Sequence, residues 1–186
     1  MEIHLGAVRM DVDVPCSSTP SPSEPSQPIR TTLCELLKDP DRFNGKMVRV
    51  RAKVYFGFEA SLLRDGTHEI WLSAGFLVTM FRPGGSAPEG SPVVLRKDAE
   101  YRKMTAYLSK LHTLKNGSAC PLCPLYAVTV DATGRFDHVD KIATPPEQRR
   151  YVGFGHMNGY ESQLVLESVS NVVASPIDPS IYERMR

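Results

Sequence analysis

The most regular pattern in the chain is an alternation of apolar and charged residues that begins at Met47. Apolar side chains occupy every second position, and basic residues and a tyrosine lie between them: Val48, Val50, Ala52 and Val54 alternate with Arg49, Arg51, Lys53 and Tyr55. A period of two places the first set in a core and the second on the outer face of a β-strand. The pattern predicts a strand from Met47 to Leu63 that bends at Gly57.

A short helix is expected immediately before this strand. Thr32 and Glu35 have the spacing of a capping box, in which each side chain accepts a hydrogen bond from the backbone N–H of the other residue. The ring of Pro40 disfavours a helical conformation at the residue before it, so the helix ends there. Asn44-Gly45 then turns the chain into the strand. The apolar stripe of the helix consists of Leu33, Leu36 and Leu37.

The segments before and after Gly57 count as the first two strands, and three further strands and a second helix are expected after a turn at Asp65-Gly66. The residues from 82 to 92 are rich in Gly and Pro and predict an exposed loop. The helix begins at Asp98, whose carboxylate can cap it, and ends at the left-handed stop Asn116-Gly117. Its apolar positions recur at intervals of three and four: Tyr101, Met104, Leu108 and Leu111. The strands are Glu69 to Ser73, Tyr126 to Phe136 and Gln163 to Val173.

Composition divides the chain into three parts. The stretch 15–28 (PCSSTPSPSEPSQP) is rich in proline and serine, and it holds too little apolar surface to offset the entropy of ordering it. We therefore expect a flexible tail and linker over 1–29, a folded domain over 30–174 and a C-terminal tail over 175–186.

The overall composition is that of a folded globular protein. Hydrophobic residues at 41% and charged residues at 23% exclude a wholly disordered or fibrous chain. The formal net charge is +1, so no global field gathers nucleic acid or an acidic membrane, and any anion site has to be local. No run approaches the roughly 18 apolar residues of a membrane-spanning helix, so no membrane-spanning segment is expected.

The order helix, three strands, helix, two strands is that of the OB-fold, a five-stranded, partly open Greek-key barrel. Three stretches also resemble uncharacterised bacterial proteins of OB-fold type: TLCELLKDPDRFNGKMVRVRAKVYFGFEASLLRDG from position 32, GRFD at 134–137 and GFGHMNGYESQLVLESVSNV at 153–172. The resemblance covers about residues 30–174. It implies a mainly β protein, a five-stranded OB-fold-like Greek-key barrel with an N-terminal helix and a helix between strands 3 and 4. It implies no catalytic residues, because OB barrels carry oligonucleotides, oligosaccharides or protein partners on one strand face.

The outer face of the first predicted strand is the strongest candidate for a ligand site. Arg49, Arg51 and Lys53 are expected about 6 to 7 Å apart, and Tyr55 continues the row. Such a row can follow the phosphates of a single-stranded nucleic acid. The leading hypothesis is a non-enzymatic OB-type binding module that uses the outer face of strands 1–3. Its partner would be a single-stranded nucleic acid or a protein.

Aromatic residues near this row can supply stacking surfaces. Tyr55, Phe58 and Trp71 are the candidates. Each base that stacks on an aromatic ring contributes about 1 to 3 kcal/mol to the free energy of binding. The alternative is an ordinary solvated strand face. Its basic side chains would then pair with Glu59 or Glu69, and Trp71 would belong to the core.

Cys120 and Cys123 have the spacing of half a zinc site. His112, with His138 or His156, can complete a tetrahedral set of zinc ligands. The two thiols can equally form a local disulfide, take part in redox exchange or remain unreactive, although a thioredoxin-like motif should open a helix beside a βαβ unit. These alternatives stay open, and zinc is the one cofactor that the sequence suggests.

The segment Gly153 to Gly159 is a glycine-rich loop between the last two strands. It lacks the GxGxxG spacing and the lysine of phosphate-binding loops. The favoured interpretation gives its glycines a positive φ, with Phe154 plugging the barrel end and His156 bonded to the backbone. In the functional alternative, His156 and Tyr160 contact a ligand at the barrel mouth.

Ordinary structural roles are expected for two other features. Asp137, His138 and Asp140 lie near no recognisable serine or cysteine nucleophile, and turn chemistry explains them better than acid–base catalysis. Cys34 lies inside the first helix and is expected to act as a small buried apolar group.

Cys16 is followed by Ser-Ser and a Pro/Ser tether, which resembles the start of a mature bacterial lipoprotein. The chain as written carries no apolar segment before it and is expected in the cytoplasm. A start further upstream would move the protein to the cell envelope. This gives a second hypothesis, a protein-interaction domain tethered to the envelope. A third is a zinc or redox protein built around Cys120 and Cys123.

Overall fold

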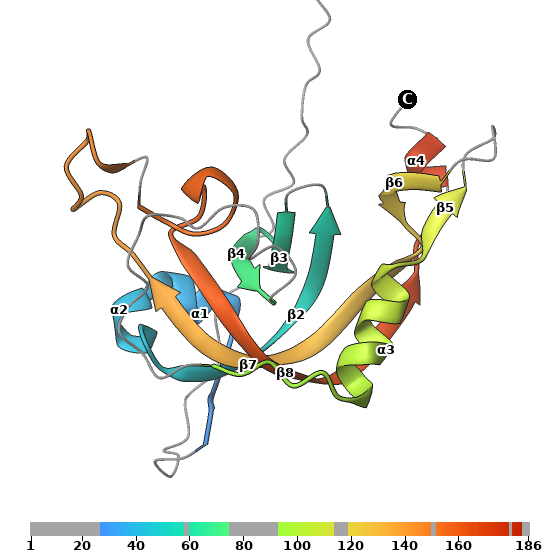
Figure 1. Cartoon of the computed structure of the whole chain (residues 1–186), viewed down its shortest axis with the longest axis horizontal. Coiled ribbons are helices and arrows are strands. Elements are labelled where there is room, and N and C mark those ends of the chain that lie inside the picture. Colours follow the sequence, from blue (N-terminus) through green and yellow to red (C-terminus); the bar gives the residue numbers. More distant parts are fainter. Residues whose placement is uncertain are drawn as a thin grey trace, which may run out of the picture.

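Five strands close into a barrel in the computed structural model, which describes residues 27–57, 60–74, 93–113, 119–149, 152–178 and 180–183 (Figure 1). In chain order these strands are β2 (Met47–Gly57), β3 (Ala60–Asp65), β4 (His68–Ser73), β7 (Tyr126–His138) and β8 (Ser162–Pro176). The order round the barrel is β2-β3-β4-β8-β7, and β7 pairs again with β2. Only the β4–β8 pairing of the barrel is parallel. The predicted mainly β, OB-fold-like barrel is confirmed.

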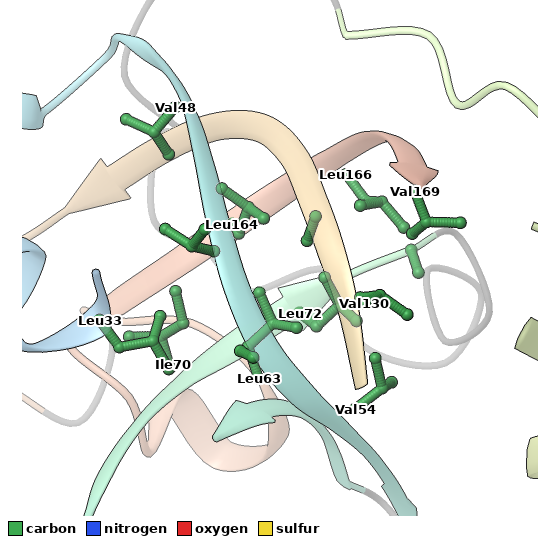
Figure 2. Packing of buried hydrophobic residues seen from close by; sticks show 14 of the residues in the cluster. Leu33, Val48, Val54, Leu63, Ile70, Leu72, Val130, Leu164, Leu166 and Val169 are labelled. Atoms are coloured by element: carbon green, nitrogen blue, oxygen red, sulfur yellow. The ribbon is translucent and has the colours of Figure 1, made fainter. Parts of the chain in front are cut away.

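The barrel interior is filled by alternate residues of its strands. Val54 lies opposite Leu63, Leu63 lies opposite Ile70, and Leu72 lies opposite Leu164. All of these side chains are buried in one apolar cluster, and Figure 2 shows them converging between the strands. Residues in register point to the same face of a sheet. The inward-facing residues of β2 and of its neighbouring strands therefore form a single core.

The predicted capping box begins helix α1 (Leu33–Lys38). The Glu35 N–H donates to Thr32 Oγ1 at 3.1 Å, and the Thr32 N–H donates to Glu35 Oε2 at 3.2 Å. The helix stops at Asp39, and Pro40 opens a second short helix, α2 (Pro40–Phe43). Leu33 and Leu36 are fully buried in the barrel core, and α1 packs against β3 and β4.

Helix α3 (Ala99–Leu108) is capped by the predicted residue. Asp98 accepts a hydrogen bond from the Tyr101 N–H at 3.0 Å, and Tyr101 and Met104 are buried against the inner face of β7 and β8. The helix ends at Leu108, so the prediction that it continues through Leu111 is wrong. Leu111 instead begins β5 (Leu111–Thr113), which pairs with β6 (Ala119–Pro124), and this pairing gives its backbone a partner outside the helix.

Strands β7 and β8 continue beyond the barrel as a curved arm, on which α3, β5, β6 and α4 (Ser180–Glu183) gather (Figure 1). The hydroxyl of Tyr182 on α4 donates to the carbonyl of Pro124 at 3.0 Å. This bond shows that α4 folds back onto β6. Strand β8 ends at Pro176, beyond the predicted end at Val173.

Two further differences from the predicted strands concern backbone pairing. The chain does not bend at Gly57 and continue; it reverses, because Gly57 pairs with Ala60 and the two flanking segments form the antiparallel hairpin β2–β3. A short strand that the sequence pattern did not indicate, β1 (Ile29–Thr31), pairs in parallel with β2. Three residues are too few to display a period.

Several predictions concern residues outside the described ranges: most of the 1–29 linker, Cys16, Phe58, Glu59, the 82–92 loop and Asn116-Gly117. Within the described residues, no helix has the length and apolar character required to cross a bilayer.

Candidate ligand-binding face

The predicted basic row lies on the outer face of β2. Val48, Val50 and the other alternate residues are buried in the core, whereas Arg51 and Lys53 are exposed and Arg49 is half-buried. The row is bordered by β7 on one side and by β1 and β3 on the other. No part of the described chain covers the side chains of Arg51 and Lys53.

The two arginines of the row find their partners on β7. Arg49 Nε donates to Thr133 Oγ1 at 3.1 Å, and Arg51 Nη1 lies 2.7 Å from Asp131 Oδ1. Each pair joins residues that are directly opposite in the β2–β7 register. The sequence alternative placed Glu69 beside this row, but Glu69 instead binds Arg64, with Nη2 and Oε2 2.5 Å apart.

Asp131 is held in its charged form by this arrangement. Burial by itself would raise the pKa of Asp131, but hydrogen bonds from Asn171 and Arg51 and the charges of Arg51 and Arg49 lower it below the ordinary value. Asn171 Nδ2 donates to Asp131 Oδ2 at 2.7 Å. The carboxylate thus ties β2 to both strands of the arm.

Like charges stand directly opposite each other at two places on this surface. Arg30 on β1 is in register with Arg49, and Lys53 is in register with Arg64. Neither Arg30 nor Lys53 has an ion-pair partner within the part of the chain that the structure describes. Like charges directly opposite each other are unfavourable in a sheet, and of these four side chains only Arg64 has a carboxylate partner among the described residues, Glu69. We call Arg30, Arg49, Arg51, Lys53 and Arg64 the basic face.

An apolar row crosses the end of the basic face. Tyr55 lies opposite Leu62, and Leu62 lies opposite Trp71, so the three side chains share the outer side of β2, β3 and β4. The guanidinium of Arg64 lies 5.7 Å from the centre of the Tyr55 ring. Tyr55 is half-buried, but Trp71 is only 8% exposed.

Trp71 is buried because residues 152–160, which we call the cover segment, lie over it. Phe154 packs with Leu62 and Trp71 in an apolar cluster separate from the barrel core. The prediction that Phe154 plugs the barrel end is therefore wrong; its backbone pairs with Tyr160, which directs it to the outer face.

Two glycines of the cover segment, Gly153 and Gly155, have the predicted positive φ, whereas Gly159 does not. Gly153 has a φ of 131° and Gly155 a φ of 73°, and Met157 and Asn158 in the turn η2 (His156–Asn158) also have positive values, 51° and 55°. His156 is the first residue of this turn. The loop carries no sequence of helical N–H groups of the kind that cradles phosphate.

An open hollow of about 410 Å³ lies beside the cover segment. Burial and the nearby charge of Glu69 raise the pKa of Tyr160, one of its lining residues. His138 Nδ1 lies 2.9 Å from Ser162 Oγ, and the two residues are cross-strand neighbours on β7 and β8. The polar residues of the hollow are Glu69, His138, Lys141, Tyr160, Glu161 and Ser162.

The acidic residues around His138 have structural partners. Asp140 caps a turn by accepting hydrogen bonds from the N–H groups of Ile142 and Ala143, as turn chemistry predicts. Asp137 differs from that expectation, because it is fully buried in β7 and forms a bidentate ion pair with Arg135.

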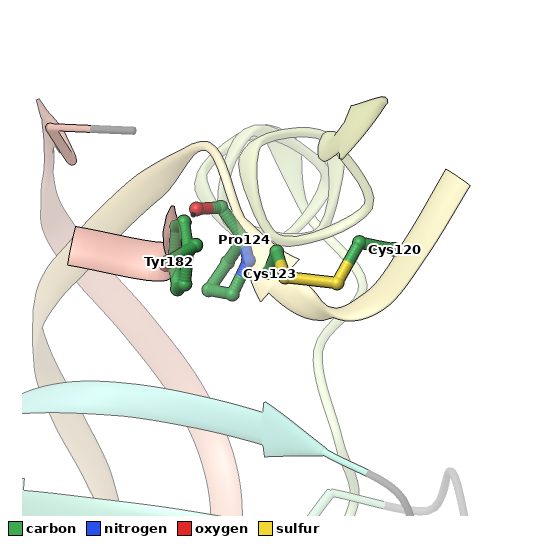
Figure 3. Close-up of a disulfide and its surroundings, with 4 residues drawn as sticks. All are labelled: Cys120, Cys123, Pro124 and Tyr182. Carbon is green, nitrogen blue, oxygen red and sulfur yellow. Dashed lines mark hydrogen bonds between the residues drawn. A yellow bond between two sulfur atoms is a disulfide. The ribbon is translucent and has the colours of Figure 1, made fainter. Parts of the chain in front are cut away.

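Cys120 and Cys123 are joined as a disulfide on β6, beside Pro124 and Tyr182 (Figure 3). In this state their sulfur atoms are bonded to each other. His112 packs its ring against Tyr182, with centroids 5.2 Å apart. Among the described residues, no three His, Cys, Asp or Glu side chains are grouped as metal ligands.

Cys34 is half-buried and is itself disulfide-bonded, so the prediction that it acts as a small buried apolar group is wrong. The reason is that its side chain does not share the stripe of Leu33 and Leu36, which face the core.

Sequence reasoning missed two members of the basic face. Arg30 precedes the capping box on a strand too short to show a period, and Arg64 looked like the end of a strand near a turn. The register of β1 and β3 against β2 brings both to the row. No protein-family model, curated protein or solved structure matches this chain, so the likeness of its barrel to the OB-fold rests on strand order alone.

Proposed function

We propose that this protein is a non-enzymatic binding module of OB type whose ligand is a single-stranded nucleic acid lying along the basic face. The observation that carries the proposal is the in-register placement of like charges on neighbouring strands, Arg30 opposite Arg49 and Lys53 opposite Arg64. Like charges in register are unfavourable in the free protein and become favourable when phosphates lie between them.

The local charge supports an anionic ligand. The basic face holds five cationic side chains against two carboxylates, those of Asp131 and Glu69. This excess of three positive charges is larger than the formal net charge of the whole chain, which is +1. A local excess on a nearly neutral protein directs an anion to one surface.

The shape of the surface favours an extended polymer over a small anion. Alternate residues of a strand lie about 6 to 7 Å apart, so Arg49, Arg51 and Lys53 present charges in a line. Tyr55 follows at the end of the line with a half-buried ring beneath Arg64, which suits a stacked base. A linear series of cations followed by an aromatic ring matches a single strand with its phosphates and bases.

The test is the binding of fluorescein-labelled oligothymidylate, followed by fluorescence anisotropy over a range of salt concentrations. Arg30→Glu with Lys53→Glu reverses two charges that have no acidic partner in the described chain, so folding should be preserved. We expect the affinity to fall at least about tenfold. The slope of log affinity against log salt should flatten by about 0.7 for each lost phosphate contact.

The control is Lys97→Glu with Lys103→Glu, which makes the same change in net charge just before α3 and on α3, the helix that packs against β7 and β8. This variant should lose far less affinity, because only the global charge has changed. Equal losses in the two variants, or no binding by the wild-type protein at low salt, would overturn the proposal.

A further inference from the structure

The cover segment lies directly on the face of the Trp71 indole. A Cβ atom built on Gly155 would come within 3.0 Å of three indole carbons, Cε3, Cδ2 and Cζ3. The peptide of Gly155 therefore occupies the position above the ring that a planar ligand would need. Tyr160 closes one side, with its ring centroid 5.7 Å from that of Trp71.

The cover segment packs through Phe154 and Tyr160 and contains an unfavourable backbone conformation at Met157. Phe154 and Tyr160 exchange two backbone hydrogen bonds, of 2.8 and 3.1 Å, and Lys141 Nζ donates to the Asn158 carbonyl. Met157 has a positive φ, which is strained for a residue with a side chain, and that side chain is 81% exposed. The exposed side chain adds no packing that would offset this strain.

The surface beneath the cover segment continues the basic face. The row Tyr55, Leu62, Trp71 starts at the end of the line formed by Arg49, Arg51 and Lys53. A strand bound to the basic face would reach Tyr55 first and would meet Trp71 next if the cover segment moved away.

We propose that the cover segment is an autoinhibitory lid that competes with a nucleobase for the face of Trp71. The inference rests on the proposed function, since it adds a base-stacking subsite to the same ligand path. In the closed form the Gly155 peptide takes the place of the base. In the open form a base of the bound strand stacks on Trp71, so opening and tight binding are coupled.

Gly155→Ala tests the lid, because the added methyl group collides with Trp71 and forces the segment outward. Gly45→Ala is a matched control: Gly45 has a φ of 74°, almost the same as Gly155, and a methyl group there meets nothing within 4 Å. Both variants carry the same backbone strain, and only one of them displaces the lid.

Trp71 is the only tryptophan of the chain, so its fluorescence reports this site alone. We expect Gly155→Ala to increase the quenching of Trp71 by acrylamide and to tighten oligothymidylate binding at least about fivefold, the lower limit for one stacked base. Gly45→Ala should resemble the wild-type protein in both measurements.

A second variant tests the lid independently, in case Gly155→Ala does not fold. Lys141→Met removes the hydrogen bond to the Asn158 carbonyl and leaves Trp71 and the basic face untouched. It should also raise both quenching and affinity. Because this substitution removes a positive charge, tighter binding cannot have an electrostatic origin.

The outcomes separate the two proposals. If wild-type protein binds oligothymidylate through the basic face, but exposing Trp71 leaves the affinity unchanged, the lid is refuted and the binding function stands. If none of the variants binds, the binding function itself is refuted and the lid with it.

Discussion

Arg51 on β2 and Asp131 on β7 stand directly opposite each other across the strand pair that closes the barrel, with Nη1 and Oδ1 2.7 Å apart. The arginine side chain is 52% exposed and the aspartate 20% exposed. The pair therefore belongs both to the closure of the barrel and to the surface proposed to bind a ligand.

The first prediction concerns the pH dependence of this pair. The pKa of Asp131 is lower in the folded protein than its ordinary value near 4, so ionised Asp131 stabilises the fold above about pH 4. This contribution is lost as the pH falls through the lowered pKa. A double-mutant cycle of Arg51→Gln and Asp131→Asn should give a coupling of about 0.2 to 1 kcal/mol at pH 7.

The measurement is the free energy of urea unfolding for the four proteins of the cycle at several pH values. The coupling should vanish in strong acid, where Asp131 is protonated in the folded and unfolded states alike. A coupling of the same size at neutral pH and in strong acid would contradict this assignment.

The second prediction concerns the buried ion pair of Arg135 and Asp137. Arg135 Nε lies 2.7 Å from Asp137 Oδ1, and Gln163 Nε2 donates to Asp137 Oδ2 at 3.0 Å. Asp137→Ala should destabilise the protein by about 3 to 5 kcal/mol, because it leaves a buried guanidinium without its carboxylate. Urea unfolding provides the measurement.

The matched control for this pair is the double substitution Arg135→Met with Asp137→Leu. It removes both charges and fills the space with apolar groups, so it should recover most of the lost stability. A double variant as unstable as Asp137→Ala would mean that other contacts of Arg135 dominate the effect.

The third prediction concerns the way α1 completes the core. Leu36 is fully buried together with Leu33, so Leu36→Ala leaves a cavity at the point where α1 meets β3 and β4. The free energy of unfolding should fall by about 2 to 5 kcal/mol. Val94 is 75% exposed, and Val94→Ala should change stability by no more than about 0.5 kcal/mol. Similar losses in both variants would show that α1 is not part of the core.

The fourth prediction concerns the disulfide on β6. Cys120→Ser with Cys123→Ser should cost at most about 2 kcal/mol, because the loop closed by the bond is very short. Thiol titration of the native protein should find these two cysteines unreactive until a reductant is added. Reactive thiols at both positions in the native protein would favour the zinc or redox alternatives.

The sequence by itself determined the features that depend on near neighbours in the chain. The alternation of β2, the capping box of Thr32 and Glu35 and the cap at Asp98 are local patterns, and each appears in the structure as predicted. The five barrel strands and their order along the chain followed from the same kind of pattern, because a period of two separates a core face from an outer face. The short strands β1, β5 and β6 did not, because they show no such alternation.

Only the tertiary structure decided which of these faces meet. The partners of Arg49 and Arg51 are Thr133 and Asp131, 84 and 80 residues away in the sequence, and the cover of Trp71 comes from the loop between β7 and β8. These contacts depend on the register between distant strands, and a shift of one residue would send every side chain to the opposite face. No local pattern encodes that register, because it is set by the packing of the whole barrel.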